Sequence, residues 1–173
     1  MEKDEQLRKT RGTEFVSYAI KRMAQDAGYG ARLRRADNPA TESQSWEHLV
    51  GWCDLEKPWE RASFASIAAA LARAKPEKDG VWGIGRALAS CYDEKKESQP
   101  ARARLRRLLA CDDAEEACRV LRPMLALIRS KGKPLCYARL LDELLWFGEK
   151  RKLRWAEDFF GRREQDDSDH VHP

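Results

Sequence analysis

The sequence contains no run of about 20 apolar residues, so it predicts no membrane-spanning helix. Its N-terminal stretch, MEKDEQLRKTR, is charged and lacks the apolar core of a signal peptide, which favours a cytoplasmic protein. The cysteines are odd in number and have neither C-x-x-C spacing nor neighbouring histidines, so we expect no disulfide framework and no zinc site. We expect all of them to be reduced, small core residues: Cys53, Cys91, Cys111, Cys118 and Cys136.

Catalytic motifs are also missing, because G-x-S-x-G, H-E-x-x-H and the Walker A pattern do not occur. The adjacent pairs Asp142–Glu143 and Glu157–Asp158 do not face each other on a helix, which favours solvated or salt-bridged carboxylates. His48 is more typical of a helix surface or core than of a general base. The sequence therefore predicts no catalytic residue, no metal and no cofactor. An enzyme that uses Glu157, Asp158 or His48 remains an alternative.

The chain also lacks the alternation of apolar and polar residues that strands show, whereas apolar residues recur at helical spacing throughout. We therefore expect an all-α fold, a compact or elongated bundle of about seven to nine helices. One domain should span 13–161, with possible sub-bundles at 13–92 and 100–161. A flexible N-terminus, 1–12, and a disordered tail, 162–173, should flank it.

Several residues predict local features of this bundle. Gly28 and Gly30 should end the first helix, and Pro123 predicts a kink or two short helices. The G-x-G at Gly83–Gly85 follows no strand and lacks a third glycine, so it predicts a helix start or a close-packing site. The tryptophans should lie mostly in the core, with Trp59 and Trp82 nearest to loops. The last helix should turn four residues inward: Leu153, Ala156, Phe159 and Phe160.

Charged residues make up 36% of the chain but nearly balance, at a formal net charge of +4, so their distribution carries more information. No Asp or Glu lies between Ala117 and Leu141, although Arg and Lys are frequent there. The stretch ARARLRRLLA places Leu105 and Leu108 on one side of a helix and spreads arginines over the rest.

The planar fork of arginine matches phosphate oxygens, so this segregation of charge predicts a surface for a polyanion. We expect it to contact a nucleic-acid backbone with little reading of bases. The alternatives are a stand-alone, sequence-nonspecific nucleic-acid-binding protein and a helical adaptor that binds other proteins.

Four motifs follow one another in a recognisable order. They are GARLRR, GIGRALA, RLRRLLA and ARLLDELLWFG followed by AEDFF, and together they extend over about residues 15–160. This order resembles the CasB family, the small subunit of the type I-E CRISPR surveillance complex, Cascade. No single motif is specific, since each is a loose arginine–leucine pattern, and the resemblance depends on their order and spacing.

The resemblance implies an all-α, non-enzymatic subunit of a cytoplasmic prokaryotic complex. Its implied partners are the repeated backbone subunit, the large subunit, the guide-RNA ribonucleoprotein and a second copy of itself. It also implies that the chain helps to hold the target strand and the displaced non-target strand of DNA during antiviral interference. Base pairing with the guide, and not this subunit, would then read the sequence.

The resemblance further implies nucleic-acid contacts at the basic residues of the matching motifs. Arg86 and Arg139 lie closest to apolar stripes, so a structural ion pair stays open as an alternative for both. The expected nucleic-acid-binding residues are Arg34, Arg35, Arg86, Arg104, Arg107, Arg119, Arg139, Lys150 and Lys152.

Overall fold

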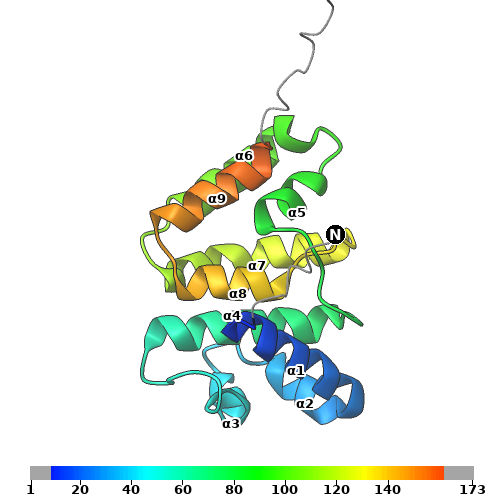
Figure 1. Ribbon diagram of the computed structural model, residues 1–173, viewed down its shortest axis with the longest axis vertical. Coiled ribbons are helices and arrows are strands. Elements are labelled where there is room, and N and C mark those ends of the chain that lie inside the picture. Colours follow the sequence, from blue (N-terminus) through cyan, green and yellow to red (C-terminus); the bar gives the residue numbers. More distant parts are fainter. Residues whose placement is uncertain (1–8, 162–173) are drawn as a thin grey trace, which may run out of the picture.

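Residues 9–161 are described by the structure, a computed structural model; the predicted tail and most of the predicted flexible N-terminus lie outside them. This part of the chain forms nine α-helices and two short 3-10 helices (Figure 1), which confirms the all-α prediction. None of these helices is long and apolar enough to cross a membrane. In chain order the elements are α1 (Arg11–Gln25), α2 (Ala27–Leu33), η1 (Glu42–Ser45), α3 (Trp46–Leu49), α4 (Pro58–Ala74), α5 (Ile84–Ser90), η2 (Lys95–Glu97), α6 (Gln99–Leu109), α7 (Ala114–Ser130), α8 (Tyr137–Leu145) and α9 (Glu149–Phe160).

The helices stack in layers along the long axis of the molecule (Figure 1). Helices α5, α6 and α9 lie at one end, α7 and α8 cross the middle with α4 next to them, and α1, α2 and α3 lie at the other end. Helix α5 packs on α9, α4 packs on α7 and α8, and α1 packs on α8. The predicted sub-bundles 13–92 and 100–161 are therefore interleaved in space, because α5 lies with the C-terminal helices.

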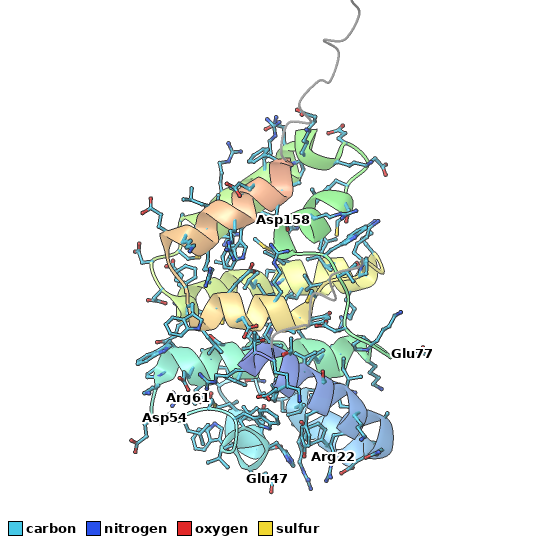
Figure 2. All side chains as sticks on the ribbon, viewed as in Figure 1. Arg22, Glu47, Asp54, Arg61, Glu77 and Asp158 are labelled. Atoms are coloured by element: carbon cyan, nitrogen blue, oxygen red, sulfur yellow. The ribbon has the colours of Figure 1, made fainter. Side chains whose placement is uncertain are left out.

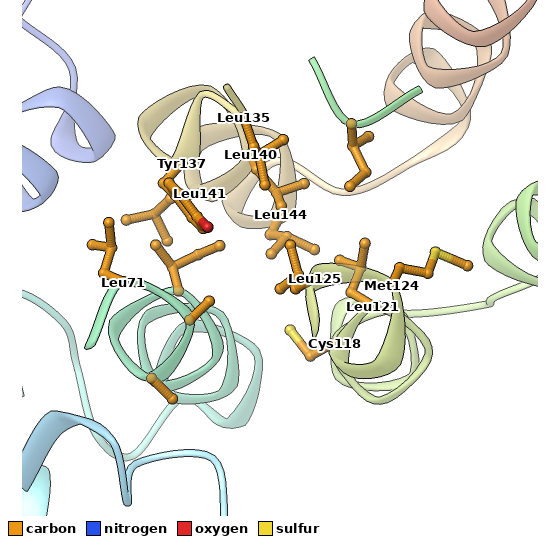
Figure 3. Close-up of a cluster of buried hydrophobic side chains, with 14 of the residues drawn as sticks. Leu71, Cys118, Leu121, Met124, Leu125, Leu135, Tyr137, Leu140, Leu141 and Leu144 are labelled. Carbon is orange, nitrogen blue, oxygen red and sulfur yellow. The ribbon is translucent and has the colours of Figure 1, made fainter. Parts of the chain in front are cut away.

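One continuous apolar core joins the layers. Leu71 of α4, Leu125 of α7 and Leu141 of α8 converge at its centre (Figure 3), and each is buried. The described cysteines are all free; four of them are buried, as predicted for core residues, whereas Cys136 is half-buried. The apolar stripes read from the sequence of α4 and α7 are therefore the faces on which these helices pack.

Two helices begin at carboxylates from distant parts of the chain. Asp142 of α8 accepts the backbone N–H of Gly12 in α1 at 2.9 Å, and Asp158 of α9 accepts that of Arg86 in α5 at 2.9 Å. The first N–H groups of a helix have no partner within it, and carboxylates also favour the positive end of the helix dipole. Asp142 and Asp158 were expected to be solvated or salt-bridged, and instead they cap these helices. The described chain also becomes helical earlier than residue 13, at Arg11.

Helices α5 and α9 approach so closely that no side chain fits between them at one position. A Cβ on Gly85 would overlap the carbonyl oxygen of Trp155 and lie 2.6 Å from the backbone nitrogen of Phe159. Gly83 is the N-cap of α5, and a Cβ there would lie 3.0 Å from the guanidinium carbon of Arg139. The G-x-G is thus both a helix start and a close-packing site, as the sequence predicted.

The predicted end of the first helix is wrong, and so is the division of a later helix into two at Pro123. Gly28 and Gly30 lie inside α2; the first helix ends earlier, at Gln25, because Asp26 caps the next helix by accepting the N–H of Tyr29 at 3.2 Å. Pro123 lies inside α7, which stays one helix of 17 residues. Its side chain is exposed, so the ring lies on the side of α7 away from the core.

The predicted inward face of α9 is also partly wrong. Leu153 is 58% and Phe160 41% exposed, whereas Trp155 and Phe159 are buried. The large indole of Trp155 takes the core position and thereby rotates the helix, so Leu153 turns to solvent. The expectation that tryptophans lie mostly in the core is wrong for three of them, which are exposed: Trp46, Trp59 and Trp146.

Candidate nucleic-acid interface

Two basic segments that are far apart in the sequence meet at the carboxylate of Asp37. Arg73 of α4 donates two hydrogen bonds of 2.7 Å to Asp37, one to each oxygen. Arg122 of α7 places its Nε 3.5 Å from the same carboxylate. Arg73 also donates to the backbone carbonyl of Arg34 at 3.2 Å. The turn that carries Arg34 and Arg35 is thereby held against α4 and α7.

Asp37 balances only part of the positive charge around it. Its side chain is 12% exposed and lies between Arg73 and Arg122. The hydrogen bonds to Asp37 raise the pKa of the Arg73 guanidinium, against the opposing effect of burial, so Arg73 stays charged. Because two cations share one carboxylate, this junction keeps a net positive charge. The Arg122 side chain is 52% exposed and can reach a ligand from solvent.

The exposed side of α7 extends this positive area. Arg119, Arg122 and Arg129 follow one another at i, i+3 and i+10, so they lie in one stripe along the helix. Leu121 and Leu125 on the other side of α7 are buried. Within residues 9–161, neither Arg119 nor Arg129 forms an ion pair. We call the surface formed by these arginines and their neighbours the Asp37 face: Arg34, Arg35, Arg73, Arg119, Arg122 and Arg129.

Two hollows indent the Asp37 face. One, of about 150 Å³, lies between α4 and α7 and is lined by Arg73, Arg122 and Arg129. The other, of about 430 Å³, lies between α4, α7 and residues 36–42, and Arg119 and Arg122 line it. Because Asp37 and Arg122 line both, the two hollows adjoin. Basic side chains therefore border a concave surface, and Glu42 and Glu115 line its larger hollow beside them.

Three of the predicted site residues belong to this face: Arg34, Arg35 and Arg119. Arg119 is exposed at the larger hollow. Arg34 lies at the edge of the face and also lines a separate hollow beside α1 and α2. Arg35 donates to the side-chain oxygen of Gln44 at 2.6 Å. The structure thus joins the GARLRR motif to the acid-free stretch of α7.

Arg104 and Arg107 lie on a second basic area, at α6. Burial raises the pKa of the Cys91 thiol, and the positive charges of Lys133, Lys131 and Arg104 oppose that rise. These cations therefore gather near the end of α5, where α6 and the loop after α7 come together. Arg107 is exposed one turn further along α6.

Arg86 and Arg139 lie in neither basic area but line a groove of about 560 Å³ between α5, α8 and α9. Arg86 lies over the ring of Trp82 at 4.3 Å, and Arg139 pairs with buried Glu143 at 3.0 Å. Figure 2 labels Asp158 of α9 at this groove, opposite α5. Carboxylates match the arginines in number, which favours the structural ion pair that the sequence left open for Arg139. The charged residues in and beside the groove are Arg86, Arg139, Arg154, Glu143, Glu157 and Asp158.

Lys150 and Lys152 are not brought to the Asp37 face. Lys150 is exposed, and the ammonium of Lys152 lies 5.3 Å from the ring centre of Phe147. Their neighbours Arg151 and Arg154 line hollows on the α8 side of α9 instead. The rotation of α9 explains why Arg151 and Arg154, and not the lysines, face α8. Positions 151, 154 and 155 share one side of a helix, and Trp155 is buried on that side.

Three residues of the Asp37 face were missing from the predicted site: Arg73, Arg122 and Arg129. The helical spacing of Arg119, Arg122 and Arg129 was a signal that could have found two of them. No local pattern marks Arg73, because its partner Asp37 lies on another element and only the fold brings them together.

Exposed guanidinium groups of this kind donate paired hydrogen bonds to phosphate oxygens. They hold no proton at neutral pH that could be transferred, because arginine is not deprotonated in proteins. Within residues 9–161, no three His, Cys, Asp or Glu side chains gather as they would around a metal ion. The chemistry that the Asp37 face offers is therefore the binding of anions.

Comparison with known proteins identifies the family. Residues 30–160 match the family described as CRISPR-associated protein Cse2 (CRISPR_cse2). CasB from Thermus thermophilus has a similar structure, with a TM-score of 0.70, 27% identity and coverage of 89% of this chain and 100% of that chain. A second structure from Thermus thermophilus, of a CRISPR-associated protein of the Cse2 family, has a TM-score of 0.69 and 26% identity, and the match covers 87% of this chain and 98% of that chain. CasB from M. ruber has a TM-score of 0.66 and 25% identity, and the match covers 87% of this chain and 93% of that chain. No curated protein sequence matches this chain.

The family match covers most of the described helices, from α2 to the end of α9. This chain therefore belongs to the CRISPR-associated Cse2 family. Within that family it is a CasB-type small subunit of the type I-E Cascade complex, as the resemblance of its motifs predicted.

Proposed function

We propose that this Cascade subunit holds a DNA strand by its phosphate backbone, and that the Asp37 face is where it does so. The observation that supports this proposal is the meeting of two separate arginine segments at one carboxylate. Arg73 bonds both Asp37 and the backbone carbonyl of Arg34, and Arg122 pairs with Asp37, so the turn that carries Arg34 and Arg35 is tied to α4 and α7. A ligand with regularly spaced negative charges suits such a surface better than a single small anion.

Strand holding would act on the R-loop, in which guide RNA pairs with the target strand and displaces the non-target strand. The RNA–DNA hybrid is about as stable as the DNA duplex that it replaces, so small protein contacts tip the balance. A surface that binds only the opened state stabilises it by mass action. Contacts to phosphates would achieve this at every target sequence, as antiviral interference requires.

The proposed role needs no catalytic residue and no cofactor, and it depends on neighbours in the complex. We propose that the repeated backbone subunit, the large subunit and a second copy of this chain place the Asp37 face beside the opened strands. Arg104 and Arg107, on the separate α6 area, are then a second place where a strand could be held, with Lys131 and Lys133 beside them. The guide-RNA ribonucleoprotein would supply the sequence recognition.

The test is R-loop formation by a reconstituted Cascade complex on a supercoiled target. Arg119→Glu with Arg129→Glu reverses two exposed charges of the Asp37 face. The complex should assemble as before, because neither side chain is buried, and the fraction of target in the R-loop state should fall about tenfold, an effect of roughly 1.4 kcal/mol. Lys21→Glu with Lys78→Glu changes net charge equally at two exposed positions away from the face, and it should have little effect.

Two other outcomes of the R-loop experiment would count against strand binding by the Asp37 face. A complex that assembles with the double Arg variant and forms R-loops as well as the parent contradicts the proposal. A complex that no longer assembles would show that the Asp37 face binds a protein subunit, which is the adaptor alternative.

A further inference from the structure

The larger hollow of the Asp37 face has features that phosphate binding alone does not require. Small apolar side chains line it, among them Ala62 and Ala65 of α4 and Pro39. A volume of about 430 Å³ exceeds what a single phosphate group needs. Arg119 and Arg122 line it as well, so an anionic backbone that they hold would pass beside these apolar side chains.

Two carboxylates line this hollow beside the arginines. Glu42 and Glu115 line it, and within residues 9–161 neither side chain accepts a hydrogen bond or forms an ion pair. Ser66 is 6% exposed and also lines the hollow. A ligand that presents N–H donors would satisfy these groups.

We propose that this hollow, which we call the Ala62 hollow, receives one unstacked nucleobase of the bound strand while Arg119 and Arg122 hold its phosphates. The base would lie against the alanine and proline side chains, and the guanidinium of Arg119 would cover it, as arginine does on aromatic faces. This inference rests on the proposed function and goes beyond it, because phosphate contacts alone carry no information about bases.

The carboxylates also set which base fits. Glu42 and Glu115 only accept hydrogen bonds when ionised, so they favour a base with an exocyclic amino group. Cytosine, adenine and guanine carry one, whereas thymine offers a single N–H between two carbonyl oxygens that carboxylates repel. The strand should therefore be bound more tightly when it carries cytosine than when it carries thymine.

The experiment compares three labelled strands of equal length by fluorescence anisotropy, with the full chain. They are an oligomer of deoxycytidine, one of thymidine, and one in which abasic residues carry the same phosphates. Stacking of one base on a protein is worth about 1–3 kcal/mol, so the abasic strand should bind about tenfold more weakly than the cytosine strand. The thymidine strand should lie between the two.

Ala62→Leu fills the Ala62 hollow and keeps every charge, since Ala62 is a half-buried residue at its edge. It should bind all three strands with the weak affinity of the abasic strand. Ala24→Leu, the matched control at an exposed position of α1, should keep the difference between strands. If Ala62→Leu does not fold, Glu42→Gln with Glu115→Gln is the second variant; it should reduce the preference for cytosine over thymine, while the abasic strand binds at least as tightly as before.

Equal binding of cytosine and abasic strands by the parent chain would overturn the base site and leave phosphate binding intact. A preference that survives in Ala62→Leu would also overturn it. Absence of binding to every strand would count against the proposed function itself. In that case a titration with deoxycytidine monophosphate decides the base site separately. Saturable shifts of the amide NMR signals of Ala62 and Ser66 would support it, and unchanged signals would overturn it.

Discussion

Glu143 shows how a single buried residue can hold two helices in place. Its side chain accepts hydrogen bonds from the indole N–H of Trp155 at 2.7 Å and from the Nε of Arg139 at 3.0 Å. Trp155 is the residue that fixes the rotation of α9, so this carboxylate links α8 to the position of α9. The adjacent acidic pair that the sequence left as a solvated or salt-bridged surface is therefore partly internal.

Glu143→Ala leaves the Trp155 N–H buried without a partner and removes the counter-charge of Arg139. We expect the free energy of unfolding in urea to fall by about 2 kcal/mol. Glu157→Ala removes an exposed carboxylate of α9 and should change stability by less than about 0.5 kcal/mol. Equal midpoints and slopes for Glu143→Ala and the parent chain would contradict this role of Glu143.

Glu60 gives a prediction for the dependence of stability on pH. Hydrogen bonds from the Arg11 guanidinium, at 3.1 and 3.2 Å, lower the pKa of Glu60 below its ordinary value. A carboxylate with a lowered pKa stabilises the fold above its ordinary pKa of about 4.3 and loses this effect as the pH falls through its folded pKa.

Glu60→Gln should therefore lower the free energy of unfolding by about 1 kcal/mol at neutral pH, a modest value because Arg11 is half exposed. In strong acid, where Glu60 of the parent chain is also protonated, the difference should vanish. Urea unfolding of both proteins at several pH values measures it. A difference that stays constant from neutral to acid pH would show that the charge of Glu60 is not responsible.

Helix α5 is held in place by its contact with α9. α5 has seven residues, too few for a stable isolated helix, so its place depends on packing. Gly85 allows its backbone to touch that of α9, and Asp158 caps its first turn. α5 and α9 therefore form one unit, although they are distant in the sequence.

Gly85→Ala would force these two backbones apart. Overpacking costs about 1–3 kcal/mol, and the gain in helix propensity offsets only part of it, so we expect a loss of about 2 kcal/mol. Gly51→Ala, where a Cβ would meet nothing within 4 Å, is the control and should be close to neutral. Thermal unfolding followed by circular dichroism compares them. A Gly85→Ala protein as stable as the Gly51→Ala protein would show that α5 and α9 can separate without cost.

The sequence predicts the buried face of some helices and not of others, and the difference has physical causes. Apolar spacing was sufficient for α4 and α7, because one face of each helix is continuous and buried. For α9 it was not, because apolar residues lie on both sides and only the size of Trp155 selects the inner one. Gly28 and Gly30 do not end the first helix, because Asp26, a good N-cap, ends α1 and starts α2 before them.

Across the whole molecule, the distribution of charge decides function more than its sum. The acid-free stretch of α7 carries the exposed basic stripe of the candidate interface, and the spacing of its arginines along a helix indicates that stripe from the sequence. Which other arginines join them depends on the fold: Arg73 and Asp37 connect α4 to the turn after α2, and no spacing in the sequence shows this. Arg86 and Arg139 look equally basic in the sequence but lie among as many carboxylates in the groove beside α9.

Phosphate binding by the Asp37 face is the central property proposed for this chain. The salt dependence of strand binding tests that property most directly. The measurement is fluorescence anisotropy of a labelled single strand of mixed sequence with the full chain, repeated over a range of salt concentrations. Each phosphate neutralised on a single strand adds about 0.7 to the slope of log K against log salt, so Arg119→Glu with Arg129→Glu should lower this slope by about 1.4. Helicity and melting temperature should stay unchanged, while Lys21→Glu with Lys78→Glu should leave the slope as it is. A folded Arg119→Glu, Arg129→Glu protein with the slope and affinity of the parent would contradict the account.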